Sequence, residues 1–315
     1  MRVRFWVVIS VLACVGPALA ADTVDQTAQD ETEPGVSQQE GASQEEIDAF
    51  NDAKKAAKKE RVEEALQQDN TGNDPRVFAN KWTPFYKQTE LENGLTQQDL
   101  TAFGSLAFTP YLGMFYEVPL AQYRDFSDVP GLPPGVESDA IGVGDTSLKF
   151  LYRPKGWDFH YGQDGKKSGS FLFGTDMVLP TATDKALAGN ALLFAPIVGV
   201  VIDMPAHGFF AMLNLYYFDV YKNDSAPETS LYVGRWFYMQ PLTRPGTWWG
   251  GIFLMPEFQP IYDFETKDSS LWIGVELGKV LPGGKVAYVK PGWGISNSEP
   301  TDRKFSFEVG FRWFF

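Results

Sequence analysis

The carboxyl-terminal segment, residues 305–315, alternates between large apolar and polar side chains, and this alternation restricts the fold more than any other feature. One face of an extended strand would carry Phe305, Phe307, Val309, Phe311, Trp313 and Phe315, and the other Ser306, Glu308, Gly310 and Arg312, with Phe314 as the exception. Side chains two residues apart share a face of a strand. A soluble sandwich rarely has an apolar face of large aromatic residues up to the chain end, whereas a lipid-facing strand does. The segment therefore predicts an all-β protein, an antiparallel transmembrane β-barrel.

Three earlier segments show the same alternation. The predicted lipid-facing sets are Gly144, Thr146, Leu148, Phe150 and Tyr152; Phe171, Phe173, Met177 and Leu179; and Leu271, Ile273, Val275 and Leu277. The predicted lumen-facing sets are Asp145, Ser147, Lys149 and Arg153; Ser170, Gly174 and Asp176; and Gly274, Glu276 and Gly278. A lysine or arginine on the lipid face costs roughly 2–4 kcal/mol at the membrane centre, which decides the faces. Arg235 does not fit this scheme: either it lies near a membrane interface, or the register of its segment differs.

Short β-like segments separated by Gly, Pro, Asp and Asn fill the chain from about residue 78. We expect strands near 102–110, 112–120, 143–153, 169–180, 191–204, 208–220, 229–240, 248–262, 270–280, 285–295 and 304–315. Bacterial single-chain barrels have even strand numbers, so a twelfth strand is expected near 78–88 or within a long segment. A barrel of about 12 strands encloses either a narrow pore or a lumen plugged by loops or by the N-terminal extension.

The first twenty residues predict a secretory signal peptide. Arg2 and Arg4 precede an apolar stretch at 5–16, and Ala18 and Ala20 form an A-x-A cleavage site. The single cysteine, Cys14, lies inside this segment, so the predicted mature chain has no disulfide and no thiolate metal site. A lipoprotein signal ending at Cys14 is the weaker alternative.

Residues 21–77 predict an acidic, partly helical extension before a barrel at 78–315. Between Ala21 and Arg76 the chain holds fifteen acidic and six basic residues and almost no aromatic ones, so this region cannot bury its own core. Ser43 and Glu46 form a capping box for a helix over 43–68. That helix is either a solvated part of a disordered extension or a segment that binds a periplasmic partner. Nothing in the charge pattern indicates nucleic acid.

Two motifs resemble segments of an outer-membrane family named for the meta-pathway of phenol degradation. The stretch 141–147, IGVGDTS, resembles a strand-start segment of that family, and 179–184, LPTATD, resembles its turn. The resemblance covers roughly residues 90–315. It implies a barrel that passes hydrophobic or aromatic compounds, and it transfers no catalytic or binding residue. The glycine, proline and aspartate of the motifs are typical of turns.

The sequence offers little for catalysis or metal binding, and we expect no enzyme activity, no cofactor and no metal. His160 and His207 are the only histidines, and Ser168 and Ser170 show no distinctive spacing from the first. The histidines have no metal-binding spacing. Asp263, Glu265 and Asp268 form either an ordinary solvated loop or an acidic loop that holds Ca²⁺.

The charged residues on inward-facing positions are the candidate site. The candidate lumen-lining residues are Asp145, Lys149, Arg153, Asp176, Glu276, Lys290, Glu308 and Arg312. They form either an ion-pair network that satisfies itself or a permeation path that sets charge selectivity. Trp272 and Tyr288 share the inward parity and offer either an aromatic wall or simple packing. Phe311, Trp313 and Phe315 resemble the signature by which such barrels are recognised for assembly.

We therefore expect a barrel in the cell outer membrane of a Gram-negative bacterium, surrounded by lipid and lipopolysaccharide and inserted by the barrel assembly machinery. The first functional hypothesis is a passive channel or transporter for small, hydrophobic or aromatic molecules. The alternative is a non-conducting structural or interaction protein whose helix at 43–68 binds a periplasmic partner. A barrel enzyme that acts on lipid and a soluble secreted β-protein are the remaining alternatives.

Overall fold

The computed structural model describes residues 73–127, 129, 139–162, 167–184, 187, 189, 191–222, 228–243, 250–296 and 303–315. The predicted signal peptide, with its cleavage site at Ala18 and Ala20, and the predicted helix at 43–68 lie outside the described residues. Within the described part of the chain, no helix combines the length and the apolar character needed to cross a membrane.

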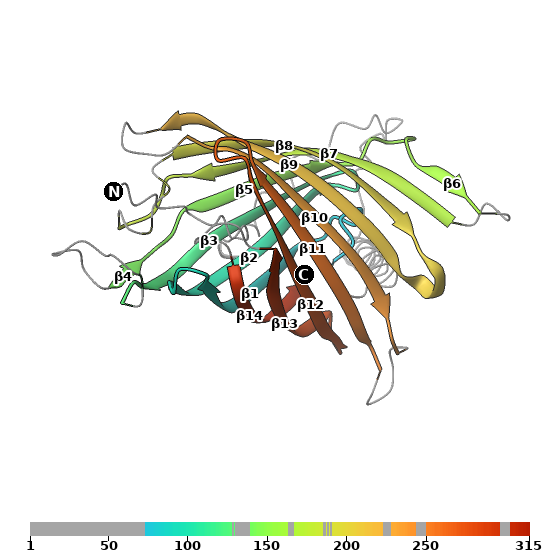
Figure 1. The fold of residues 1–315 in the computed structure, drawn as a ribbon. Coiled ribbons are helices and arrows are strands. Elements are labelled where there is room, and N and C mark those ends of the chain that lie inside the picture. The colour runs from blue at the N-terminus through green and yellow to red at the C-terminus, as the bar shows by residue number, and fades with distance from the viewer. Residues whose placement is uncertain are drawn as a thin grey trace, which may run out of the picture. The chain divides into compact units, whose positions relative to one another are not determined.

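The described residues form a closed antiparallel β-barrel of twelve strands (Figure 1). The strand segments are β1 (Lys81–Leu91), β2 (Thr96–Thr109), β3 (Leu112–Asp125), β4 (Asp139–Gly142), β5 (Thr146–Tyr152), β6 (Phe159–Tyr161), β7 (Lys167–Leu179), β8 (Ala191–Asp203), β9 (Phe209–Lys222), β10 (Ser230–Pro241), β11 (Ile252–Asp263), β12 (Asp268–Leu281), β13 (Lys285–Ser296) and β14 (Arg303–Phe314). A short 3₁₀ turn, η2 (Pro205–His207), joins β8 to β9. Pairing of β2 with both β1 and β3 closes the ring, so no sheet edge is left.

Three of the segments belong to one barrel strand. β4 and β5 both pair with β3 in a single register, since Gln122 lies opposite Gly142 and Glu117 opposite Ser147. β5 and β6 in turn both pair with β7. The interruptions at 143–145 and 153–158 break this strand without changing its place in the ring, which reconciles the segments with twelve barrel strands.

The predicted strands are confirmed, including the twelfth, which is β1. The largest boundary difference is in β2, which begins at Thr96 and not near residue 102. Its first residues are mostly polar, and Gln97 and Asp99 are buried on the lumen side. A strand with a polar lumen face can extend beyond its apolar stretch. A strand boundary predicted from apolar residues alone therefore falls too far inside the strand.

Closure joins the first strand to the last. In β1 and β14, Lys87 lies opposite Glu308 and Phe85 opposite Gly310, and the rings of Trp82 and Trp313 stack at 5.6 Å on the outer face. We call the end of the barrel where β1 begins and β14 ends the terminal end, and the other the opposite end. The tight turns at 110–111 and 282–284 lie at the terminal end.

The outer face carries the apolar side chains that the alternation predicts. Phe307, Val309 and Trp313 are exposed, whereas Ser306, Glu308 and Arg312 of the same strand are buried inside the barrel. Aromatic side chains gather near both ends of the outer face. Those in contact with one another include Trp82, Phe311 and Trp313 at the terminal end, and Tyr216, Phe218, Tyr262 and Phe264 at the opposite end. Two aromatic girdles around an apolar band are typical of a lipid-facing surface.

One predicted facing is wrong. Gly144 was expected on the lipid face, but a side chain there would point at the Gln122 side chain, which is itself buried inside. Even-numbered residues face inward up to the interruption, as Gly142 and Gly144 do, and odd-numbered residues face inward after it, as Ser147 and Lys149 do. The interruption at 143–145 therefore reverses the alternation. A strict period of two fails wherever a strand is interrupted.

The lumen has two unlike walls. β7 to β10 contribute mainly apolar inward side chains, which form the largest buried cluster, among them Leu172, Ile197, Val201, Leu213, Leu215, Phe237 and Met239. The strands from β11 through β14 to β3 contribute most of the buried charges. Because both faces of β8 to β10 are largely apolar, the inward face of these strands cannot be recognised from sequence alternation.

Candidate functional site

The candidate site is a cavity of about 100 Å³ inside the lumen. Its apolar side includes Ile197, Leu213, Leu215 and Phe237, and its charged side includes Lys149, Arg235, Lys290 and Arg312. Asn73, Asp74 and Pro75, which precede the first strand, also line it. The cavity therefore lies between the two walls and the N-terminal end of the described chain.

Glu257 on β11 joins two cations. Arg235 Nε lies 2.7 Å from Glu257 Oε1, and Lys290 Nζ lies 2.7 Å from Glu257 Oε2. The alternation in the sequence assigned Arg235 to neither face of its strand. The structure puts it in the lumen, on the same inward face as Phe237, and neither near a membrane interface nor on the lipid side. Its neighbours on that face are apolar, which is why the alternation did not reveal it.

Two further carboxylates bind predicted lumen residues. Arg312 Nη1 and Nη2 donate to the two oxygens of Glu276 at 2.8 and 2.9 Å, and Asn73 donates to the same carboxylate at 3.2 Å. Asp176 accepts hydrogen bonds from Ser147 at 2.7 Å and Tyr217 at 2.8 Å, and lies 3.1 Å from Lys149 Nζ. A fully buried carboxylate requires such partners, because desolvation otherwise disfavours its charge.

The two predicted aromatic lumen residues are both buried. Tyr288 donates to Glu308 at 2.8 Å, and the Arg312 guanidinium lies 4.2 Å from the centre of the tyrosine ring. Lys290 and Arg303 lie 5.4 and 4.7 Å from the Trp272 ring. Trp272 also fills the space above Gly274 and Gly292, where a side chain would clash with its ring. These rings pack beneath the cations, and of the two only Tyr288 reaches the cavity.

Arg153 and Asp145 are not brought together with the other candidates. Arg153 lies near the terminal end, where its guanidinium donates to the backbone oxygen of Arg76 and lies 5.5 Å from the Tyr111 ring. Asp145 lies near the opposite end, where it accepts from the backbone N–H groups of Ala182 at 2.9 Å and Gly189 at 2.6 Å. Neither lines the cavity.

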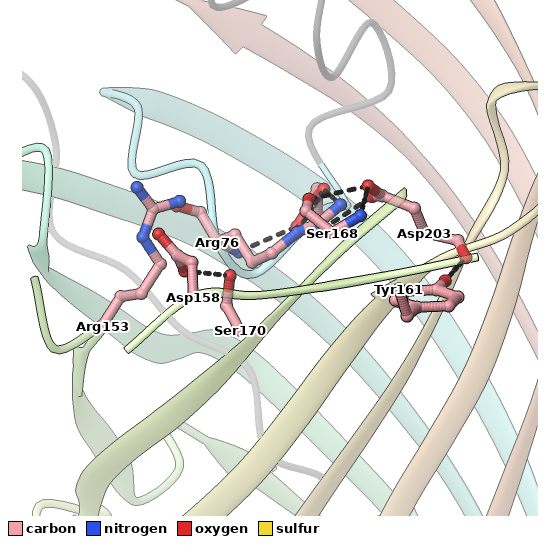
Figure 2. A network of polar contacts seen from close by, with 8 residues as sticks. Arg76, Arg153, Asp158, Tyr161, Ser168, Ser170 and Asp203 are labelled. Carbon is pink, nitrogen blue, oxygen red and sulfur yellow. Dashed lines mark hydrogen bonds and ion pairs between the residues drawn. The ribbon is translucent and has the colours of Figure 1, made fainter. Parts of the chain in front are cut away.

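The N-terminal segment Asn73–Asn80 occupies the lumen near the terminal end, held by a polar network (Figure 2). Arg76 binds Asp74 at 2.6 Å and Asp203 at 2.8 Å, and Ser168 donates to Asp203 at 2.7 Å. Figure 2 shows Arg76 between Arg153 and Asp203. Burial opposes the charge of Arg76, but hydrogen bonds and attraction from the two aspartates outweigh burial and raise the pKa of its guanidinium above the usual range.

The turn after β7 binds the interruption between β4 and β5, so the two family-like motifs contact each other. Thr183 Oγ1 accepts from the N–H of Val143 at 3.0 Å, and Thr181 Oγ1 accepts from the N–H of Thr146 at 2.9 Å. Leu187, from the same connection, is buried at the opposite end in a cluster with Leu91, Leu95, Phe126 and Ala140. The motifs therefore have a structural role, because they join the connection after β7 to the strand interruption at the opposite end.

Several buried charges escaped the sequence analysis. Besides Glu257 and the partly exposed Arg235, they include Lys81, Lys87, Asp99, Glu117 and Arg124 on β1, β2 and β3. Each occupies an inward position of a strand whose outward positions carry fewer aromatic residues than β14. In 81–89, the polar residues Lys81, Thr83, Lys87 and Thr89 share one face, and this was the available signal.

The structure adds no catalytic constellation to these contacts. Within the described residues neither His160 nor His207 hydrogen-bonds a serine, and His160 is exposed. Ser168 and Ser170 donate instead to Asp203 and Asp158. Among the same residues, no group of His, Cys, Asp or Glu is placed to hold a metal ion.

A scan of the sequence against protein-family models gives no match, and a search of curated proteins gives none. Among solved structures, the chain is similar to an outer membrane channel from Pseudomonas putida F1, with 12% identity over 76% of this chain and 96% of that one and a TM-score of 0.57.

Two further similarities are to the translocator domain of the autotransporter NalP from Neisseria meningitidis (12% identity, 84% and 98% coverage, TM-score 0.42) and to the outer membrane protein OprD from Pseudomonas aeruginosa (8%, 77% and 96%, 0.36). The similarity to the Pseudomonas putida F1 channel shows the fold, and the apolar outer face is suited to lipid. The chain is an outer-membrane β-barrel, and its place is the cell outer membrane.

Proposed function

We propose that this barrel is a passive outer-membrane channel for small solutes. The observation that carries the proposal is the cavity between the two lumen walls, lined by charged side chains on one side and apolar ones on the other. A barrel of twelve strands is wider than the eight-stranded kind that its own side chains fill. Lining charges set the selectivity of such paths.

The segment Asn73–Asn80 acts in this proposal as a plug. It narrows the path at the terminal end through three contacts with the wall: Asn73 with Glu276, Arg76 with Asp203, and Phe78 with Phe115. We place the terminal end in the periplasm, because short turns are typical of the periplasmic side of outer-membrane barrels. The plug would then enter from the periplasm.

The resemblance of 141–147 and 179–184 to the phenol-degradation family favours hydrophobic or aromatic solutes, and the apolar wall around Leu213 and Phe237 fits such solutes. Lipid and lipopolysaccharide around the outer face, and recognition of Phe311, Trp313 and Phe315 by the assembly machinery, belong to the same proposal. We continue to expect no enzyme activity and no cofactor.

The decisive experiment is single-channel recording of the refolded full-length mature chain in planar bilayers, beside a version that starts at Ala79. Folding is checked first by the difference in gel migration between unheated and heated samples. We expect small conductance steps from the first protein and larger ones from the second, because the truncation removes the plug.

A point variant tests the plug without shortening the chain. Asp203→Asn weakens the contact with Arg76 and should raise the mean conductance or the open fraction. Asp139→Asn, at an exposed position at the opposite end, is the matched control and should change neither. Absence of conductance from all folded forms would overturn the channel proposal and leave the alternative, an interaction protein whose helix at 43–68 binds a periplasmic partner.

A further inference from the structure

Some cations of the cavity are more exposed than the carboxylates that bind them. The side chain of Arg235 is 30% exposed, whereas its partner Glu257 is fully buried. Lys149 is 17% exposed and its partner Asp176 is fully buried. The side chain of Lys290 is likewise more exposed than that of its partner Glu257. A solute inside the lumen therefore meets Arg235 and Lys149 but not Glu257 or Asp176, which do not line the cavity. Asp74, Glu276 and Glu308 do line it, beside Lys81, Lys290 and Arg312.

Arg235 is the best placed of these cations. Its Nε and Nη2 donate to Glu257, and within the described part of the chain its Nη1 makes no hydrogen bond. Glu257 is shared with Lys290, so one carboxylate balances two cations. The shared carboxylate fixes the guanidinium in position and leaves part of its charge and one donor for a ligand.

The wall beside Arg235 is apolar. Its guanidinium carbon lies 5.4 Å from the centre of the Phe237 ring, and Ile197, Leu213 and Leu215 line the same cavity. A volume of about 100 Å³ is below the range of pockets for drug-sized ligands. It is about two thirds of the volume of a dry apolar cavity of about 150 Å³ known to accept benzene. The space therefore suits a solute no larger than one ring.

We propose that the lumen cavity binds small carboxylates with an apolar body, such as a single-ring aromatic acid, through Arg235. The carboxylate accepts from the free donor of Arg235, and the ring lies against Phe237, Leu213 and Leu215. This inference rests on the lumen being the solute path proposed above, and it adds the class of solute: a monoanion in preference to a neutral ring or to a cation.

Binding of benzoate to the refolded full chain in detergent micelles, measured by isothermal titration calorimetry, tests the site without requiring conductance. Benzyl alcohol supplies the ring without the charge, and acetate supplies the charge without the ring. We expect benzoate to bind more tightly than either probe. Arg235→Gln should weaken benzoate binding by about tenfold or more, the loss that one charge-assisted hydrogen bond predicts.

Two further variants separate a binding role from a structural one. Leu215→Trp fills the apolar side without touching a charge and should also weaken benzoate binding. Lys222→Gln removes an exposed cation whose partner is Glu228, outside the cavity, and should leave binding unchanged. Folding of each variant is confirmed by the gel-migration shift. Equal binding of benzoate and benzyl alcohol, or unchanged binding in Arg235→Gln, would overturn the proposal.

Conductance then distinguishes the inference from the function on which it rests. In a salt gradient, the full chain should pass chloride in preference to potassium, and Arg235→Gln should reduce that preference several-fold. A conducting barrel that prefers potassium and does not bind benzoate would overturn this inference and leave the channel. Benzoate binding by a barrel that never conducts would support the site and overturn the channel.

Discussion

At the scale of the residue, Glu257 shows what a lumen demands of a single carboxylate. It is fully buried, and it binds Arg235 and Lys290 from the two sides. Without it, the two cations would repel each other in a region of low dielectric, so its charge stabilises this part of the lumen wall. The strands that carry the two cations, β10 and β13, are not adjacent to each other, and Lys290 on β13 reaches Glu257 across β12. Such a contact crosses the lumen surface and cannot be read from strand spacing.

We expect Glu257→Gln to lower the free energy of unfolding by about 3–5 kcal/mol, because removing one partner leaves buried cations without compensation. Urea-induced unfolding in lipid vesicles measures this change. Glu265→Gln, at an exposed position in the turn between β11 and β12, is the control and should change stability little. A variant as stable as the parent would show that water in the lumen screens these charges.

At the scale of the element, the interruption between β4 and β5 shows how two segments far apart in sequence hold each other in place. Asp145 holds the connection after β7 through two backbone N–H groups, and Gly142 lets Thr183 approach, since a side chain there would lie 2.5 Å from its hydroxyl. The contacts between the two segments therefore explain both the glycine and aspartate of 141–147 and the threonines of 179–184. These residues were assigned to turn chemistry from sequence, and the structure shows that the turn after β7 contacts the interruption between β4 and β5.

Asp145→Asn replaces one accepting oxygen with a donor, so the N–H of Ala182 or Gly189 loses its acceptor. The lost hydrogen bond should cost about 1–3 kcal/mol. The fraction of molecules in which this connection is open should therefore rise by about tenfold. The rate of trypsin cleavage after Lys185 under native conditions measures that opening. Asp139→Asn serves as the control, and an equal increase there would contradict the role of Asp145.

At the scale of the whole molecule, closure depends on the pairing of the two strands that are most distant in sequence. β14 supplies the lipid-facing aromatic residues, and the backbone N–H of Phe315 donates to Asn80 just before β1, at 3.1 Å. The same residues that mark the chain as a barrel thus complete the ring. Until that pairing forms, β1 and β14 both expose unpaired backbone groups, which lipid cannot satisfy.

Deletion of Phe315 should therefore lower the amount of barrel inserted in the outer membrane several-fold. Quantification of the heat-modifiable form in outer-membrane fractions measures this yield. Phe264→Ala, at another exposed phenylalanine in a turn of the opposite end, should leave the yield nearly unchanged. An equal loss in both variants would show that Phe315 acts only through its apolar surface and not as an assembly signal.

The sequence by itself determined the class of fold, the number of strands and the faces of β5, β7, β12 and β14, apart from Gly144. It could do so because lipid outside and water inside impose a period of two that is visible along each strand, as in the sets around Asp176, Glu276 and Glu308. The signal fails for β8 to β10, where an apolar lumen wall makes both faces alike, and at 143–145, where an interruption reverses the alternation.

Only the tertiary structure decided which charges meet. It separated Asp145 and Arg153 from the cavity, brought Arg235 into it with Glu257 buried behind, and placed Asn73 and Arg76 inside the lumen. The physical reason is that strand spacing fixes the side of the wall on which a residue lies. Its position along the barrel axis and its neighbours across the lumen depend instead on register, closure and the path of the connections.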